Sequence, residues 1–285
     1  MEWTTIGFGE AGAALAGGIG ARGYDRKLDG AERAAKLTEF EHDGVMVCDT
    51  VRHALVAAQA VFSLVTADEA LAAANEAAAS IERGALFFDM NSVAPATKHA
   101  AAAAIESAGG RYVDAAVMAP VFPKRRDVPV LLSGPHAEAG AEALRTIGFG
   151  DVTIFPGPVG TASSIKMIRS VMVKGLEALT AECALAAEAA GVREAVFGSL
   201  DASWSKASWS ERADYNLERI MVHGLRRAAE MEEVVKTLDA LGTGSAMARA
   251  TVERQREIGG RGIVPADGLV AKLGALLDRN EEQAA

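Results

Sequence analysis

Short apolar runs alternate with longer Ala- and Glu-rich stretches through the first half of the chain. The runs have the length and β-prone composition of buried strands: Thr5–Phe8, Val45–Cys48, Val61–Val65, Ala85–Asp89, Arg111–Asp114, Val128–Leu132 and Val152–Phe155. The stretches between them have helical length and composition: Gly30–Phe40, Asp68–Arg83, Pro95–Ala108 and a helix that starts near Pro135. Strands that alternate with helices of this length predict βαβ units and a parallel sheet.

After Gly157–Gly160 this alternation stops and the pattern becomes helical throughout. One pattern without proline covers Thr161 to Ala190, and a helix of that size would be about 45 Å long. Further helices are predicted at Arg193–Leu200, Asp214–Leu241, Ser245–Ile258 and Ala266–Asn280. We therefore expect an α/β domain over residues 1–160 and an all-α domain over residues 161–285.

Apolar side chains surround most of the long helix predicted at Thr161 to Ala190. Together with their apolar neighbours, the residues Leu185, Ala178, Val171 and Met167 are expected to cover much of its circumference. One small helical domain can hardly bury so much apolar circumference, so we expect a homodimer.

Composition narrows the class of protein. Of 285 residues, 50% are hydrophobic and 24% charged, which is a globular composition, and the net charge of −9 argues against a nucleic acid or an anionic membrane as partner. Cys48 and Cys183 lie in apolar stretches without metal-ligand spacing. Together with an N-terminus that leaves no room for a signal peptide, they predict two reduced, buried thiols in a cytoplasmic protein with no membrane span and no metal site.

A glycine fingerprint stands at the end of the first predicted strand. The run Gly7-Phe8-Gly9-Glu10-Ala11-Gly12 matches G-x-G-x-x-G and opens an alanine-rich helical stretch. The first glycine suits a tight turn, the second lets a pyrophosphate approach the backbone, and the third lets helix and strand pack closely. The first domain is therefore predicted to be a Rossmann-type, dinucleotide-binding domain.

An acidic residue about 20 positions after such a fingerprint accepts hydrogen bonds from the adenosine ribose. Asp25 fits this position, and its carboxylate would repel a 2′-phosphate, so NAD is expected in preference to NADP. Arg26 leaves NADP possible, because a guanidinium can stack on adenine or pair with that phosphate.

Ser163, Lys166, Ser170 and Lys174 recur at helical spacing along the long helix. They form a polar stripe on an otherwise apolar rod. The stripe is either a solvated face or a functional surface where the helical domain meets the carboxyl edge of the sheet.

Four segments in this order resemble the β-hydroxyacid dehydrogenase family, which is akin to 6-phosphogluconate dehydrogenase. They are the cofactor loop Gly7 to Gly12, the segment Asp89 to Pro95 beside the nicotinamide, the substrate loop Asp114 to Pro120, and Gly157 to Lys166, which carries the family's catalytic lysine. The segments Met167 to Leu179 and Arg227 to Glu233 resemble a subgroup with a distinct C-terminal domain and mostly unassigned substrates.

The resemblance implies a dehydrogenase of small, anionic hydroxy acids or their keto forms, with Lys166 as general acid/base. Because an ordinary lysine has a pKa of about 10.4, partial burial would have to lower it for this role. The implied cofactor-binding residues are Gly7, Phe8, Gly9, Glu10, Ala11, Gly12, Asp25, Arg26, Val65, Thr66, Asn91 and Ser92. The implied substrate-binding residues are Ser92, Met118, Ala119, Pro120, Ser170 and His223.

The chain departs from the family at the substrate site. Met118, Ala119 and Pro120 replace Ser-Gly-Gly, and Ser170 replaces an asparagine. The segment from Gly12 to Asp25 is also shorter than usual. These changes bear on the substrate more than on the type of reaction.

Two further polar clusters leave alternatives open. His223, Arg226 or Arg227, and Glu230 recur at helical spacing, either as a salt-linked helix surface or as a polar wall over the substrate. The run Lys124 to Arg126 is either a solvated turn or a site for a carboxylate or phosphate.

Three other functions compete with a hydroxyacid dehydrogenase. An imine reductase shares the fold, although retention of Lys166 counts against it. A methyltransferase also carries a glycine-rich loop, but the all-helical second half argues against a single α/β domain. A dinucleotide-binding protein without catalysis would explain the altered substrate loop.

Overall fold

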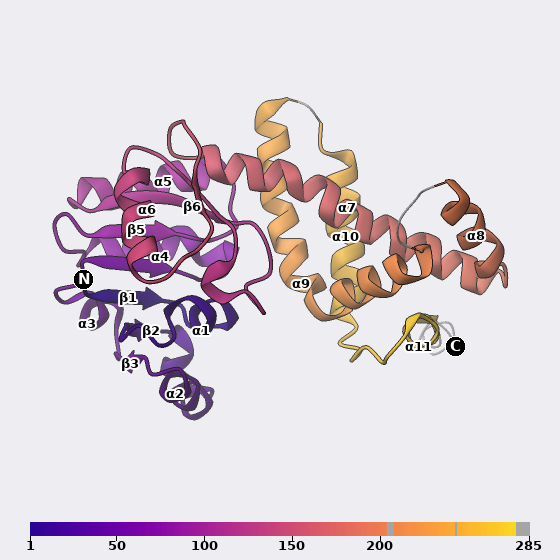
Figure 1. Ribbon diagram of the computed structural model, residues 1–285, viewed down its shortest axis with the longest axis horizontal. Coiled ribbons are helices and arrows are strands. Elements are labelled where there is room, and N and C mark those ends of the chain that lie inside the picture. Colours follow the sequence, from indigo (N-terminus) through magenta and orange to yellow (C-terminus); the bar gives the residue numbers. More distant parts are fainter. Residues whose placement is uncertain (204–207, 243, 278–285) are drawn as a thin grey trace. The chain divides into compact units, whose positions relative to one another are not determined.

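The computed structural model describes residues 1–203, 208–242 and 244–277. The chain divides into two compact units, Met1–Met167 and Ile168–Ala285. The division falls within one long helix, α7 (Thr161–Ala189), whose first residues belong to the sheet-containing unit (Figure 1).

The first unit is built on one eight-stranded sheet with the strand order β3-β2-β1-β4-β5-β6-β7-β8. Its strands are β1 (Trp3–Ile6), β2 (Arg22–Tyr24), β3 (Met46–Val47), β4 (Ala60–Ser63), β5 (Leu86–Asp89), β6 (Arg111–Val117), β7 (Val130–Ser133) and β8 (Val152–Ile154). The neighbouring pairs are parallel except β6 and β7, which are antiparallel. The predicted α/β parallel sheet is confirmed, with one antiparallel exception that the sequence pattern did not indicate.

Short helices connect these strands. They are α1 (Glu10–Ala16), α2 (Arg33–His42), α3 (Val51–Leu55), α4 (Ala70–Ala78), α5 (Pro95–Ser107) and α6 (Ala137–Thr146). Three 3₁₀ turns supplement them: η1 (Arg26–Asp29), η2 (Ala67–Glu69) and η3 (Arg125–Asp127). Pro95 is the first residue of α5. An N–H at this position has no partner within the helix, so proline costs no helical hydrogen bond.

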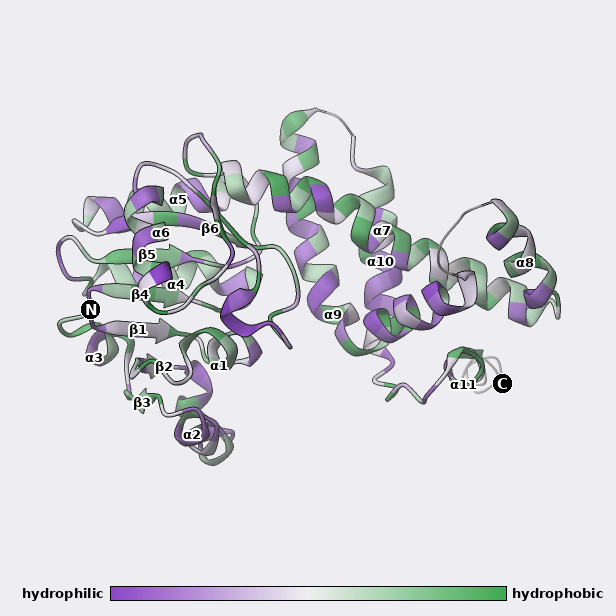
Figure 2. Ribbon diagram, viewed as in Figure 1, coloured by the Kyte–Doolittle hydropathy of each residue, from purple (hydrophilic) through white to green (hydrophobic). Residues whose placement is uncertain are grey.

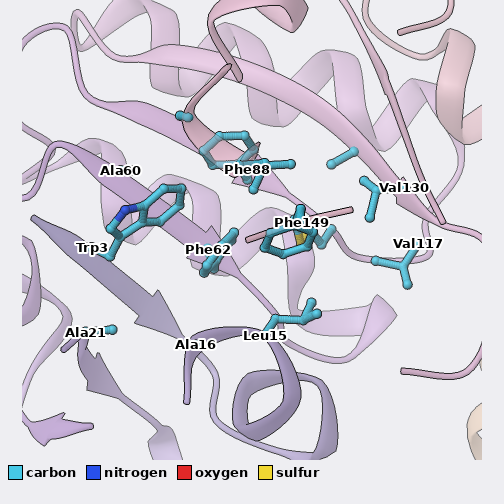
Figure 3. Close-up of a cluster of buried hydrophobic side chains, with 14 of the residues drawn as sticks. Trp3, Leu15, Ala16, Ala21, Ala60, Phe62, Phe88, Val117, Val130 and Phe149 are labelled. Carbon is cyan, nitrogen blue, oxygen red and sulfur yellow. The ribbon is translucent and has the colours of Figure 1, made fainter. Parts of the chain in front are cut away.

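Apolar side chains cover both faces of the sheet, as a parallel sheet requires. Successive strand residues point to opposite faces, so Phe62 joins the cluster with Trp3 on one side, while Val61 joins the cluster with Tyr112 on the other. The rings of Trp3 and Phe62 stack with centroids 4.8 Å apart (Figure 3). Hydropathy colouring shows β4 and β5 mostly in green (Figure 2).

The second unit is helical, and an all-α second half is thereby confirmed. After α7 come α8 (Arg193–Ser203), α9 (Trp209–Leu241), α10 (Ala246–Gly260) and α11 (Leu269–Leu277). Helices α9 and α10 pack with their backbones in close contact. A Cβ added to Gly259 would lie only 2.7 Å from the Cα of Gly224, so both helices need glycine there. Among the described helices, none has the length and apolar character to cross a membrane.

Several predicted boundaries were wrong for identifiable reasons. Helix α9 begins before Asp214 because Ser208 and Glu211 form a capping box. Strand β1 ends at Ile6, so Phe8 lies in the following loop. The end of the last predicted helix, residues 278–280, lies outside the described residues. The prediction of two buried thiols is also wrong, since Cys183 is exposed and Cys48 is partly exposed.

Candidate active site

The segments of the first unit that carry predicted site residues meet one row of residues across the sheet. Ile6 lies opposite Ser63, Ser63 opposite Asp89, and Asp89 opposite Asp114. The first three are the last residues of β1, β4 and β5. The strand order reverses between β1 and β4, and ligands of open α/β sheets bind at the carboxyl ends of strands beside such a reversal.

The glycine loop, Gly7 to Gly12, leaves the sheet at this point. Gly7 has φ +86°, and a Cβ there would lie 2.3 Å from the Leu64 carbonyl oxygen. A Cβ on Gly12 would lie 2.9 Å from the Phe8 ring, whereas one on Gly9 would meet nothing within 4 Å. Gly7 and Gly12 are therefore required by the fold, while Gly9 keeps a space beside the backbone open.

Asp25 follows β2 and faces the glycine loop. Its Oδ2 accepts from the Phe8 N–H at 2.7 Å, and its Oδ1 accepts from the Lys27 N–H at 2.9 Å. Each carboxylate oxygen has a second lone pair, so these bonds leave acceptor capacity for a ribose hydroxyl. Phe8 is buried and stacks on Phe40. Glu10 is exposed, and Ala11 is half-buried.

The cations that follow β2 are paired with carboxylates. Arg26 lies 2.5 Å from Glu69, and the carboxylate raises the pKa of that guanidinium. Further pairs are Lys27 with Glu32 at 2.7 Å and Arg33 with Asp49 at 2.8 Å. Each of these positive charges is therefore balanced by a neighbouring carboxylate.

Asn91 holds the ends of β4 and β5 together. Its Oδ1 accepts from the Val65 N–H at 2.8 Å, and its Nδ2 donates to Ser63 Oγ at 2.9 Å and to Asp89 Oδ1 at 2.8 Å. This side chain positions the loop after β4 instead of presenting its amide to solvent. Ser92 is half-buried and Thr66 is exposed.

A buried ionic cluster lies directly beneath this edge. Lys98, on α5, has no exposed surface and contacts Asp89 Oδ1 at 3.0 Å and Asp114 Oδ1 at 3.6 Å. Tyr112 donates its hydroxyl to Asp89 Oδ2 at 2.6 Å, and burial, together with the Asp89 charge, raises the pKa of that phenol. One ammonium thus pairs with carboxylates on two adjacent strands.

Asp114 also fixes the start of α7. Its Oδ2 accepts from the Gly160 N–H at 2.9 Å and from the Ser163 N–H at 3.3 Å, and it accepts from Ser133 Oγ at 2.9 Å. Ser133 Oγ in turn accepts from the Ala162 N–H at 2.9 Å. Lys166, which is half-buried, follows Ser163 by about one turn of helix.

The predicted substrate loop, Asp114 to Pro120, is only partly a loop, because Asp114 to Val117 lie in β6 and Met118 to Pro120 follow this strand. Met118 and Ala119 are half-buried, and Pro120 is exposed. Of the basic run after this loop, Arg126 donates to the Gly17 carbonyl at 2.8 Å. This guanidinium caps the C-terminus of α1, whereas Lys124 and Arg125 are exposed at the turn η3, as a solvated turn requires.

In the second unit, polar residues of the helices pair with one another. Lys174 lies 2.5 Å from Glu230; burial lowers the pKa of this lysine, while Glu230 opposes the shift. Arg227 pairs with Glu177, which also accepts from Gln255 Nε2 at 3.2 Å. These contacts support the interpretation of the His223–Glu230 stripe as salt-linked, with the ion pairs formed between helices.

The polar stripe of α7 is not a solvated face. Ser163, Ser170 and Lys174 are all buried. Ser170 and His223 belong to the second unit, and His223 is half-buried.

Lys98 is the main buried charge near the candidate site that the sequence analysis missed. It shares one buried face of α5 with Ala101, Ala102 and Ile105. A lysine on an otherwise apolar helix face indicates a buried ion pair, because a buried charge needs partners of opposite charge. Within the described residues, no group of three or more His, Cys, Asp or Glu side chains is suited to hold a metal ion.

Two protein-family models match the chain. Residues 2–143 match the NAD binding domain of 6-phosphogluconate dehydrogenase, and residues 187–258 match a domain of unknown function, DUF1932. None of the curated proteins matches.

Solved structures agree with these matches. A conserved hypothetical protein from Sinorhizobium meliloti 1021 is 36% identical, with a TM-score of 0.74, over 98% of this chain and 96% of that chain. A conserved protein of unknown function, described as structurally similar to 3-hydroxyacid dehydrogenases, is 27% identical, with a TM-score of 0.67, over 93% of this chain and 100% of that chain. A 3-hydroxyisobutyrate dehydrogenase from Mycobacterium tuberculosis shares the fold at 16% identity, with a TM-score of 0.72, over 97% of this chain and 100% of that chain. The chain belongs to the 6-phosphogluconate dehydrogenase-like family of NAD-binding proteins, in the group that carries a DUF1932 domain.

Proposed function

We propose that this protein is an NAD-dependent oxidoreductase that transfers hydride between the nicotinamide and a small hydroxy acid or its keto form. The observation that carries the proposal is the attachment of two segments to one edge of the sheet. The glycine loop follows Ile6, and Asp114, in the same row of residues, holds the first turn of α7. Oxidation of small hydroxy acids, followed through the absorbance of reduced nicotinamide, is the assay that tests it.

The residues of the first unit fit a dinucleotide. The open space beside Gly9 admits a pyrophosphate, and Asp25 retains lone pairs for the ribose hydroxyls. We assign cofactor binding to residues 1–160 and substrate binding to residues 161–285 together with Ser92 and the segment Met118 to Pro120.

Lys166 is proposed as the general acid/base. The bound nicotinamide supplies the hydride acceptor. A neutral Lys166 amine takes the hydroxyl proton of the substrate as hydride leaves its carbon, and the ammonium returns a proton in the reverse direction. Asp114 positions this lysine by holding the peptide N–H groups at the start of α7.

We expect NAD to bind about tenfold more tightly than NADP, since a 2′-phosphate would lie beside the Asp25 carboxylate at an energetic cost of about 1.4 kcal/mol. The pairing of Arg26 with Glu69 supports this order, because that guanidinium is already engaged. Calorimetric titration of both cofactors measures the difference. Equal or tighter binding of NADP would mean that Arg26 turns to the phosphate and dominates.

Gly9→Leu provides a control that affects both cofactors. The leucine side chain would fill the open space beside Gly9, so NAD and NADP should weaken together, and their ratio should stay as in the unaltered protein.

A homodimer is proposed from the surface of α7 in the second unit. Ile168, Met172, Leu176 and Leu179 recur at helical spacing and are 44% to 64% exposed. A large apolar stripe of this kind is typical of a protein interface. Sedimentation at micromolar concentration should give twice the mass of the 29.6 kDa chain, and Leu176→Glu should shift it toward monomer. A single 29.6 kDa species for the unaltered protein would contradict the dimer.

Two alternatives keep specific support. An imine reductase from Streptomyces aurantiacus has the same fold, at 21% identity and a TM-score of 0.51, but Lys166 favours alcohol chemistry. A dinucleotide-binding protein without catalysis would account for the replacement of Ser-Gly-Gly by Met118 to Pro120.

A cytoplasmic location is proposed because both cysteines are free thiols.

A further inference from the structure

Lys36 is a buried lysine whose ammonium lies at the glycine loop. It extends from α2, is 5% exposed, and donates from Nζ to the Phe8 carbonyl oxygen at 2.9 Å. It also pairs with Glu39, whose side chain is 53% exposed. A lysine is seldom buried unless its charge has a specific partner, and here one partner is a peptide of the loop.

Phe8 is held from three directions. Its N–H donates to Asp25, its carbonyl accepts from Lys36, and its ring stacks on Phe40 with centroids 4.1 Å apart. Lys36 and Phe40 both come from α2. This helix therefore fixes the orientation of the peptide that joins Phe8 to Gly9.

That orientation determines where the Gly9 N–H points. In a trans peptide the carbonyl and the N–H point in opposite directions, and the bond between Phe8 and Gly9 is trans. Since the carbonyl points to Lys36, the Gly9 N–H points away from it. A hydrogen bond to an ammonium also polarises the peptide and makes its N–H a stronger donor.

We infer that Lys36 is a positioning residue for the cofactor pyrophosphate, acting through the Phe8–Gly9 peptide to aim the Gly9 N–H at a phosphate oxygen. Helix α1 has only seven residues, so individual loop peptides matter more here than the dipole of a long helix. The inference rests on the proposed binding of NAD and adds a residue that lies outside the glycine fingerprint.

Three ligands separate pyrophosphate recognition from the rest of the site. NAD and ADP carry the diphosphate, whereas adenosine does not. Lys36→Met should weaken NAD and ADP by about tenfold in calorimetry, the effect of one charge-assisted hydrogen bond. Adenosine binding, followed by ligand-observed NMR, should stay unchanged. Lys27→Met, an exposed lysine of the neighbouring segment paired with Glu32, should leave all three ligands unchanged.

Glu39→Gln keeps the test valid if Lys36→Met does not fold. It removes the neighbouring negative charge and leaves the bond from Lys36 to Phe8 in place, so ADP should bind as tightly as before or more tightly. Weaker ADP binding by Glu39→Gln would overturn the inference. For Lys36→Met, either unchanged ADP binding or equal losses of ADP and adenosine binding would overturn it. Unaltered protein that bound neither NAD nor ADP would overturn the proposed function itself.

Discussion

Lys166→Ala should lower turnover by a factor of about 10² or more while leaving NAD affinity nearly unchanged. A positioned group that transfers a proton contributes a factor of this size, and its loss falls on the chemical step. Steady-state kinetics on a confirmed substrate, together with NAD titration of the same variant, measure both quantities.

Two comparison variants separate proton transfer from charge and packing. Lys166→Arg should lower turnover as much as Lys166→Ala does, because a guanidinium does not release its proton near neutral pH. Lys174→Ala should affect turnover far less, since that ammonium already pairs with Glu230, and its loss should fall on stability. If Lys166→Ala kept most of its activity, the assigned acid/base would be wrong, and the next candidates for this role would lie in the His223–Glu230 stripe.

Lys98→Met should destabilise the protein by about 3–5 kcal/mol, because it leaves Asp89 and Asp114 as buried carboxylates without their cation. Urea unfolding measures this difference. Lys124→Met is the matched control, since Lys124 is exposed and its loss should change the free energy of unfolding by less than about 0.5 kcal/mol.

A double variant tests whether charge is the cause. Adding Asp89→Asn to Lys98→Met removes one of the two carboxylates, so at least about 1 kcal/mol of the lost stability should return. Strictly additive losses would mean that the Lys98 side chain acts through packing alone.

Much of the fold could be predicted because its signals are local. Apolar runs such as Ala85–Asp89 are buried on both faces of a parallel sheet, so composition alone marks them. The three-residue strand β2 and the five-residue helix α3 carry too few positions for a period to appear. The capping box at Ser208 and Glu211 was visible in the sequence, and it would have given the start of α9.

The candidate site was predictable only in part. The glycine roles follow from turn geometry, and the structure gives Gly7 and Gly12 the close contacts that those roles require. The bonds from Asp114 to the start of α7 join segments far apart in the chain, and no spacing rule indicates them. The same holds for Lys36 and Phe8, because a lysine in an amphipathic helix is usually solvated.

Nicotinamide reduction by the unaltered protein over a panel of small hydroxy acids tests the central proposal most directly. We expect NAD-dependent formation of reduced nicotinamide with at least one member, faster with NAD than with NADP, and its loss in Lys166→Ala. Protein that binds NAD but reduces it with no member of the panel, and that does not oxidise reduced nicotinamide with the corresponding keto acids, would contradict a hydroxyacid dehydrogenase.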